Sequence, residues 1–326
     1  YFILGSLASG FLLYGMSLLY GITGSLQLQL IQTNLVTQAN TLSVIALIFI
    51  LAGIAFKFGA VPFHMWVPDL YDGAPTPVTL FIASAPKVAA FVMTVRLLGE
   101  ALSSIAFAST PVLIGIAVLS MAIGNVLAIA QTSIKRMLAY SSIAHVGYTL
   151  LGVLVAPIIP AGYSAAMFYI VSYALVAAGG FAIVIFMSEE GLDLDNLQDY
   201  RGLNTRHPWL AFMMLLLLFS MAGVPPTVGF FAKLGLLDVL IQGGYTSLAL
   251  VALVFALVGA YYYLRLVMYM YFVEPEPTKL QKPIVLSRER WFAITVNGLA
   301  ALFFGLMPSY LIELCTISLY TGVNNF

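Results

Sequence analysis

The chain has 326 residues, of which 62% are hydrophobic and 8% are charged, with 13 lysine and arginine residues against 13 aspartate and glutamate residues. Soluble domains contain about 25% charged residues, so this chain cannot cover itself with polar surface and is predicted to be a membrane protein. Its lack of net charge excludes a nucleic-acid-binding protein. One cysteine, Cys315, and three histidines exclude an internal disulfide, a zinc site and an iron–sulfur cluster, and no glycine-rich nucleotide motif occurs. We therefore expect no redox cofactor in this chain.

Apolar stretches predict the membrane-spanning helices. A bilayer core about 30 Å thick is crossed by a helix of about 20 apolar residues, and nine stretches reach that length. They run approximately from Ile3 to Tyr20, Leu42 to Trp66, Thr76 to Leu98, Pro111 to Ala130, Met137 to Ile159, Ala161 to Met187, Trp209 to Ile241, Leu248 to Phe272 and Trp291 to Leu311. The pattern predicts an all-α polytopic membrane protein with about nine transmembrane helices, forming a single module embedded in the lipid bilayer over residues 1–326.

The start of the chain differs from that of a secreted protein. No positively charged segment precedes the first apolar stretch and no cleavage-like sequence follows it, so it is not a signal peptide. The chain begins with Tyr1 rather than methionine, which suggests a fragment or a processed product.

The loop charges predict the orientation. All eight loop cations follow the fourth, sixth and eighth stretches: Lys135, Arg136, Arg201, Arg206, Lys279, Lys282, Arg288 and Arg290. The alternate loops, at about residues 21 to 41, 99 to 110, 160 and 242 to 247, carry none. Because lysine and arginine gather on the cytoplasmic or matrix side, these loops are predicted to lie inside. The inside is the cytoplasm if the membrane is a bacterial inner (plasma) membrane, and the matrix if it is a mitochondrial inner membrane.

One lysine is predicted to lie at the middle of the membrane. Lys87 is about eleven residues, or ~16 Å, from either end of its stretch, which is beyond the reach of its side chain. A charge at this depth costs at least ~2.5 to 3.5 kcal/mol. A lysine kept there is typical of a functional site, because burial allows it to gain and lose a proton at working pH. A permanently ion-paired structural lysine is the alternative.

Two further lysines lie beside prolines that interrupt apolar stretches. Residues 209 to 241 would extend about 50 Å as one helix, so we expect a break at GVPPTVGF, shortly before Lys233. Pro225 and Pro226 cannot donate to the carbonyl groups of the preceding turn. In the second stretch Pro62 follows Lys57, and in the third Pro86 directly precedes Lys87. Such breaks are typical of ion sites in transporters.

Histidine and hydroxyl side chains are candidates to connect these lysines. His145 has Ser141 one turn before it and Tyr148 one turn after it on one helix face. A proton relay and a hydrogen bond that only joins two helices are equally compatible with this pattern. His64, two turns after Lys57, is a similar candidate, whereas His207 is expected to be a solvated loop residue.

The other charges in the predicted helices are placed differently. Arg96 and Arg265 lie near helix ends and are expected to extend to the membrane surface. No acidic residue falls at the middle of a predicted helix, and only Asp238 lies within an apolar stretch, near its end. The buried lysines therefore lack carboxylate partners, and at least one partner is expected outside residues 1–326.

Three long strings resemble one protein family. FKFGAVPFHMWVPDLYDGAPTPVTLFIASAPK at 56–87, QTSIKRMLAYSSIAHVGY at 131–148 and AGVPPTVGFFAKL at 222–234 are similar to the chain N family of proton-translocating NADH:quinone oxidoreductase, respiratory complex I. This family is the bacterial counterpart of mitochondrial subunit 2. The resemblance covers nearly the whole chain, and PDLYDGAPTPV is closer to chain N than to its sister chains L and M or to sodium/proton antiporter subunits.

The resemblance implies an antiporter-like fold with two broken helices and a proton relay. It matches Lys57, Lys87 and Lys233 to the family's functional lysines and His64 and His145 to histidines of its hydrophilic axis. Family members carry further helices before this point, including a glutamate that pairs with the residue matching Lys57. The expected partners are the other membrane subunits of complex I, including antiporter-like neighbours, with NADH, flavin, iron–sulfur clusters and quinone in partner subunits.

Two other functions use the same residues. A stand-alone or multisubunit cation/proton antiporter would need the lysines but no respiratory partner. A scaffold subunit would hold them as inert, paired side chains. Co-purification with redox subunits distinguishes the first alternative, and a lysine substitution that preserves assembly distinguishes the second.

Overall fold

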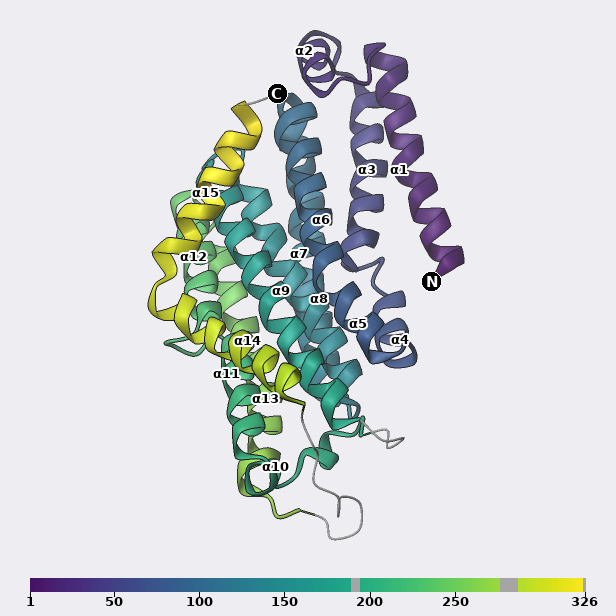
Figure 1. Cartoon of the computed structure of the whole chain (residues 1–326). Coiled ribbons are helices and arrows are strands. Elements are labelled where there is room, and N and C mark those ends of the chain that lie inside the picture. Colours follow the sequence, from purple (N-terminus) through teal and green to yellow (C-terminus); the bar gives the residue numbers. More distant parts are fainter. Residues whose placement is uncertain (189–193, 276–286, 325–326) are drawn as a thin grey trace.

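The computed structural model describes residues 1–188, 194–275 and 287–324, which form helices joined by short loops and one isolated β-bridge between Ser133 and Asn196 (Figure 1). The helices are α1 (Phe2–Thr23), α2 (Leu28–Gln38), α3 (Thr41–Phe58), α4 (Trp66–Gly73), α5 (Thr76–Ala83), α6 (Ala85–Thr94), the π-helix η1 (Val95–Ala101), the 3-10 helix η2 (Ser103–Ser109), α7 (Thr110–Ala130), α8 (Ile134–Val155), α9 (Ala161–Met187), the 3-10 helix η3 (Leu197–Tyr200), α10 (Leu203–Arg206), α11 (Pro208–Ala222), α12 (Val228–Gln242), α13 (Thr246–Phe272), α14 (Arg288–Leu306) and α15 (Pro308–Asn324).

The predicted all-helical membrane architecture is confirmed. Within the described residues, seven helical stretches are long and apolar enough to cross a bilayer: α1, α3, α5 to η1, η2 to α7, α8, α9 and α13. The seventh predicted stretch is broken as expected, into α11 and α12. A bent pair, α14 and α15, brings the number of candidate spans to eight, close to the nine expected.

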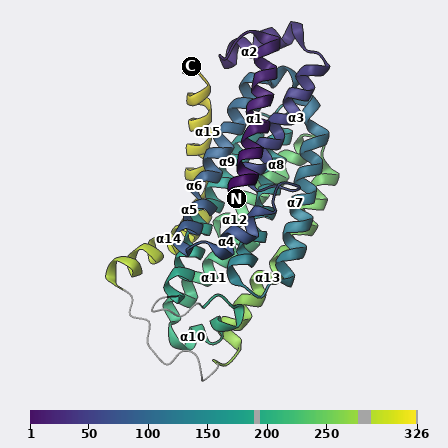
Figure 2. The same cartoon turned by 90° about the vertical axis from the view of Figure 1, so that its right-hand side faces the viewer.

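The ninth stretch, predicted from Trp291 to Leu311, is not one straight helix. It contains α14 and the start of α15, which meet at an angle of 89°. Pro308 has no backbone N–H to continue α14, and the residue before a proline avoids helical dihedral angles. Met307 accordingly lies outside the helical region, at φ −126° and ψ 62°. Figures 1 and 2 show α14 lying across the bundle and α15 running along it.

Helix α8 forms the centre of the bundle and carries His145. Of the most apolar 18-residue stretch of α8, 94% is buried inside the protein. Helices α4, α7, α9 and α12 pack around it. Close contact with α7 depends on Gly124, where an added Cβ would lie 2.6 Å from the backbone nitrogen of Ala144. Small residues at such contacts allow helix backbones to approach each other in a membrane.

The loops gather at two opposite ends of the bundle (Figure 1). One end, called the charged end here, carries Lys135 and Arg136. There the start of α8 meets the segment after α9, and the Ile134 N–H donates to the Asp195 carbonyl at 2.8 Å. At the opposite end, the Gln32 amide of α2 donates to Ser103 of η2 at 2.8 Å. Lys135 and Arg136 therefore share one end with the loop after α9. The predicted loop cations Lys279 and Lys282 lie outside the described residues.

The orientation can be tested with single cysteines in a Cys315→Ala background. An impermeant thiol reagent added outside intact cells should label the Ser247→Cys variant, at the start of α13, and should leave the Thr205→Cys variant unlabelled. Both positions are solvent-exposed in the structure, so access to the reagent depends on the side of the membrane. After permeabilisation both variants should react. Labelling of Thr205→Cys alone in intact cells would show that the orientation is the opposite of the predicted one.

Candidate functional site

The break between α11 and α12 creates a binding site for the Lys233 ammonium group. Helix α11 ends at Gly223, whose φ of 84° is the left-handed conformation common at helix ends. Two prolines follow in the break, so the carbonyl groups of Met221 and Ala222 receive no helical hydrogen bond from them. Lys233 Nζ donates to these carbonyl groups at 2.9 and 2.8 Å.

Lys233 is thus held by the end of a helix. The C-terminal carbonyl groups of a helix carry partial negative charge, which stabilises a nearby cation. In the part of the chain that the structure describes, no carboxylate forms an ion pair with Lys233. Two of the three N–H groups of the Lys233 ammonium donate to backbone carbonyl groups. The absence of an acidic residue at mid-membrane depth, noted in the sequence, is compatible with this arrangement.

Lys87 lies in a more enclosed position near the start of α6. Its side chain is 1% exposed, and Nζ donates to the hydroxyl group of Ser142 on α8. The same nitrogen lies 5.5 Å from the ring centroid of Tyr173 on α9, within cation–π range. A hydroxyl oxygen and an aromatic face can accommodate both the charged and the neutral lysine, whereas a carboxylate would fix the charged form.

His145 is hydrogen-bonded through both ring nitrogens. Nδ1 lies 2.7 Å from the Tyr169 hydroxyl, and Nε2 lies 3.1 Å from the Tyr263 hydroxyl, which also contacts Ser141. One nitrogen of a neutral imidazole donates and the other accepts. A proton that enters at one nitrogen can therefore leave from the other, which is the chemistry of a relay.

Aromatic rings place His145 between the two lysines. The Tyr173 ring, which contacts Lys87, has its centroid 4.8 Å from that of His145. Lys233 Nζ lies 5.6 Å from the ring centroid of Tyr148, one turn after His145 on α8. A cavity of about 20 Å³ is lined by both His145 and Lys233. The structure thus brings together three of the five predicted site residues, Lys87, His145 and Lys233.

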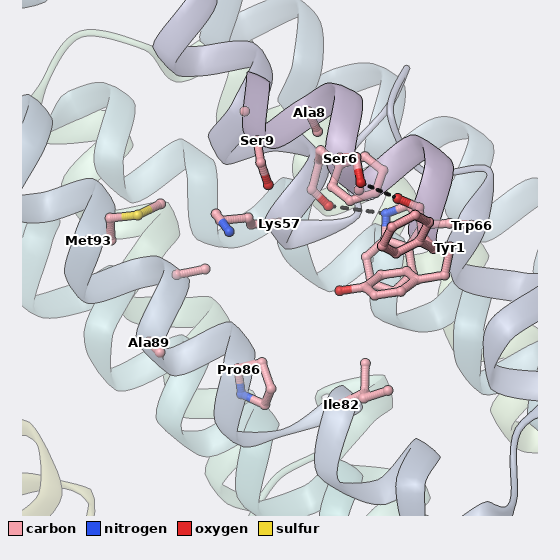
Figure 3. A pocket seen from close by; sticks show the side chains of 15 residues that line it. Tyr1, Ser6, Ala8, Ser9, Lys57, Trp66, Ile82, Pro86, Ala89 and Met93 are labelled. Carbon is pink, nitrogen blue, oxygen red and sulfur yellow. Dashed lines mark hydrogen bonds between the residues drawn. The ribbon is translucent and has the colours of Figure 1, made fainter. Parts of the chain in front are cut away.

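Lys57 faces a different space. Helix α3 ends at Gly59, with φ 73°, and Lys57 in its last turn points into a cavity of about 620 Å³. Figure 3 shows the ammonium group in this cavity, with Ser9 of α1 on one side and Met93 of α6 on another. Within the described residues Lys57 has no hydrogen-bond or ion-pair partner.

Helix α6 separates the Lys57 cavity from Lys87. Pro86, Ala89, Ala90 and Met93 line the cavity at helical spacing, while the Lys87 side chain lies on another face of the helix. His64, in the segment between α3 and α4, lines neither cavity, and its Nδ1 is buried without a hydrogen-bond partner in the described part of the chain. The described contacts therefore do not join Lys57 and His64 to the other three residues.

Residues 1–259 match the family model described as "NADH:quinone oxidoreductase/Mrp antiporter, TM". The chain belongs to this family. The match covers most of the chain and confirms the family resemblance noted in its sequence. Together with the apolar helices and the bacterial relatives described next, it makes the protein a multi-pass inner-membrane protein.

The chain is also similar to named bacterial proteins and to a solved structure. The chain is 52% identical over 324 residues to NADH-quinone oxidoreductase subunit N of Thiobacillus denitrificans, covering 99% of this chain and 66% of that protein. It is 54% identical over 317 residues to subunit N of Coxiella burnetii, covering 96% and 65%. A chain of respiratory complex I from Thermus thermophilus superposes with a TM-score of 0.83 at 35% identity, covering 96% and 67%. The chain thus spans 65–66% of the length of these curated relatives.

Two cations that were expected near the membrane surface have other contacts as well. Arg265 of α13 donates to the carbonyl groups of Ile129 and Gln131 at 2.8 and 2.9 Å and so caps the end of α7. The Arg96 side chain is 46% exposed and lies 3.4 Å from Glu100, one turn along η1. These contacts favour structural roles for both arginines.

Three tyrosines that reach His145 from other helices were missed by reasoning from charged residues, whereas Tyr148 on the same helix was noted. Tyr169 and Tyr173 are four residues apart on α9, so both face α8, and Tyr263 approaches from α13. Counting tyrosine as hydrophobic concealed their hydroxyl groups. The sequence does contain a signal for them: YIVSY in α9 places two tyrosines on one helix face. A buried tyrosine hydroxyl usually finds a hydrogen-bond partner, so such a pair indicates a polar contact inside the bundle.

Proposed function

We propose that this chain is a proton-translocating membrane subunit of an NADH:quinone oxidoreductase. The observation that carries the proposal is the arrangement of Lys87, His145 and Lys233, which places three groups able to exchange protons around one central helix. The names of the relatives and the likeness to a chain of respiratory complex I support the assignment to this complex.

In the proposed mechanism, protons pass between these groups as the charge around them changes. Lys87 accepts a proton at Nζ, where no described carboxylate retains it. His145 takes up a proton at one ring nitrogen and releases one from the other. Lys233 receives a proton while two backbone carbonyl groups hold its nitrogen in place. A change in charge at one lysine alters the free energy of protonation at the next.

The redox chemistry belongs to partner subunits in this proposal. The described residues contain no cluster of three metal-binding side chains, and the sequence has a single cysteine, so this donor set does not fit an iron–sulfur cluster. NADH, flavin, iron–sulfur clusters and quinone would bind elsewhere in the complex, and the other membrane subunits, including antiporter-like neighbours, would be the direct partners. Lys57 would serve a second proton site at its own cavity, and His64 would act in the relay from outside that cavity.

A cation/proton antiporter subunit remains the second candidate, because the family includes Mrp antiporters. Both functions use the same lysines, so the site alone does not distinguish them. Purification of the tagged full-length protein from mildly solubilised membranes distinguishes them directly. Recovery of flavin- and iron–sulfur-containing subunits supports the oxidoreductase, whereas recovery of the protein with antiporter subunits alone supports the second candidate.

The relay is tested by a Lys87→Met variant, which keeps the volume of the side chain and removes its titratable nitrogen. We expect the assembled complex to pump protons about 100-fold more slowly or worse, which is the low end of the contribution of an acid–base group. Proton uptake by inverted vesicles is the measurement. The matched control is Arg96→Gln, which removes an exposed cation. Full pumping by assembled Lys87→Met complexes would favour the scaffold function instead.

A further inference from the structure

A small cavity lies beside Lys233 at the meeting point of α8, α9, α11 and α12. Its volume is about 20 Å³, and its polar lining includes His145, Tyr169, Ser172, Ser220 and Lys233. A cavity needs roughly 10–15 Å³ and two to four polar partners to hold a water molecule. This cavity therefore has the size and the lining for one water molecule.

Ser172, which lines this cavity, has an unpaired hydroxyl group. Its side chain is 2% exposed, and its Oγ has no hydrogen-bond partner within the described residues. Buried hydroxyl groups elsewhere in the bundle donate to the carbonyl group four residues earlier, as Thr94 and Thr149 do at 2.8 and 3.1 Å. A buried hydroxyl group without a partner is destabilising, and a water molecule in the cavity that Ser172 lines would provide one.

Lys233, which lines the same cavity, has one hydrogen-bonding position left. Two N–H groups donate to the carbonyl groups of Met221 and Ala222. In the ammonium form the third N–H remains, and in the neutral amine a lone pair takes its place. The free position can therefore donate to a water molecule in one state and accept from it in the other.

Tyr169 provides the connection to His145. Its hydroxyl group lies 2.7 Å from His145 Nδ1, and the residue lines the same cavity. Both nitrogens of His145 are already hydrogen-bonded to tyrosine hydroxyl groups, so a water molecule in the cavity reaches the imidazole through Tyr169.

We propose that the Ser172 hydroxyl holds one water molecule in this cavity and so positions it between Lys233 and Tyr169. The water takes a proton from the Lys233 ammonium group and gives one of its own protons to the Tyr169 oxygen, while Tyr169 gives its hydroxyl proton to His145 Nδ1. Lys233 becomes neutral, His145 becomes charged, and the water and Tyr169 are unchanged in composition. Ser172 acts as a positioning residue, and this role rests on the proposed relay function.

The experiment compares the assembled wild-type complex with its Ser172→Ala and Ser109→Ala variants. Ser109 is also buried, but its hydroxyl donates to the Ala106 carbonyl within its own turn, outside the site. We expect Ser172→Ala to slow proton pumping about 5-fold, which corresponds to about 1 kcal/mol for one net hydrogen bond, and Ser109→Ala to leave it unchanged. Infrared difference spectra should show one strongly bound water band that shifts in ¹⁸O-labelled water and is lost only in Ser172→Ala.

The outcomes separate this inference from the proposed function. Unchanged pumping in Ser172→Ala, or a water band that persists in it, overturns the positioning role while leaving the relay intact. Absence of the band from the wild-type complex overturns it even where the variant does not assemble. A Lys233→Met variant tests the proposed function itself, because full pumping by that complex would contradict the relay regardless of the role of Ser172.

Discussion

Replacing Lys233 with arginine should abolish most proton pumping while the complex still assembles. Arginine remains charged under all conditions relevant to a protein, so it cannot release the proton that the relay must pass on. It still offers N–H donors to the carbonyl groups of Met221 and Ala222, so the α11–α12 break keeps a cationic partner. We expect a fall of about 100-fold, at the low end of the contribution of an acid–base group.

The measurement is proton uptake by inverted vesicles, with quinone reduction followed in parallel. Tight coupling would lower both rates, whereas loose coupling would lower proton uptake alone. Arg265→Lys is a suitable control, because it exchanges the same two residue types at a helix cap outside the site. Full pumping by assembled Lys233→Arg complexes would show that this lysine keeps its proton throughout the cycle.

A carboxylate from outside the described residues should face Lys57 across its cavity in the assembled complex. The cavity of about 620 Å³ is far larger than one side chain requires, and Lys57 has no partner in the described part of the chain. A carboxylate within about 4 to 6 Å would favour the charged lysine, and its withdrawal would favour release of the proton. Replacing that acid with glutamine should lower pumping about 100-fold, the low end of the contribution of an acid–base group.

The structure of the assembled complex identifies the acid, and pumping by its glutamine variant measures its role. An asparagine or glutamine variant of Asp69 serves as control, because that exposed carboxylate pairs with Arg136 at the charged end, 3.0 Å away. A resolved cavity without any acid near Lys57 would contradict the prediction, and so would a glutamine variant that pumps normally. In either case Lys57 would not be a gated proton site.

The sequence predicted those features of the fold that depend on apolar length and on proline. Helix α9 begins and ends where the sixth stretch does, and the break at Pro225 and Pro226 lies between α11 and α12. The direction of α14 was not predictable, because a run of apolar residues does not show whether its helix crosses the membrane or lies across the bundle. Pro308 accounts for the bend itself, whereas the direction that α14 takes depends on its packing against α9, α11 and α12.

The candidate site was predicted in part. Charged residues at membrane depth identified Lys87 and Lys233, because such groups are costly there. The partners of these lysines could not be derived in the same way. Lys233 binds backbone carbonyl groups, which have no sequence signature, and His145 binds tyrosines from two other helices whose pairing depends on tertiary structure. Whether Lys57 and His64 act with them stays a prediction.

In the proposed relay, the two tyrosine hydroxyl groups on either side of His145 would impose a direction on each proton transfer. A proton that enters at Nδ1 and leaves at Nε2 moves the imidazole hydrogen from one nitrogen to the other, and both neighbouring O–H groups end pointing the opposite way. A second proton cannot follow along the same path until both hydroxyl groups and the ring tautomer have been reset. Transfer through this helix is therefore expected to proceed one proton at a time, with a reorientation step between protons that no change in the lysines alone can remove.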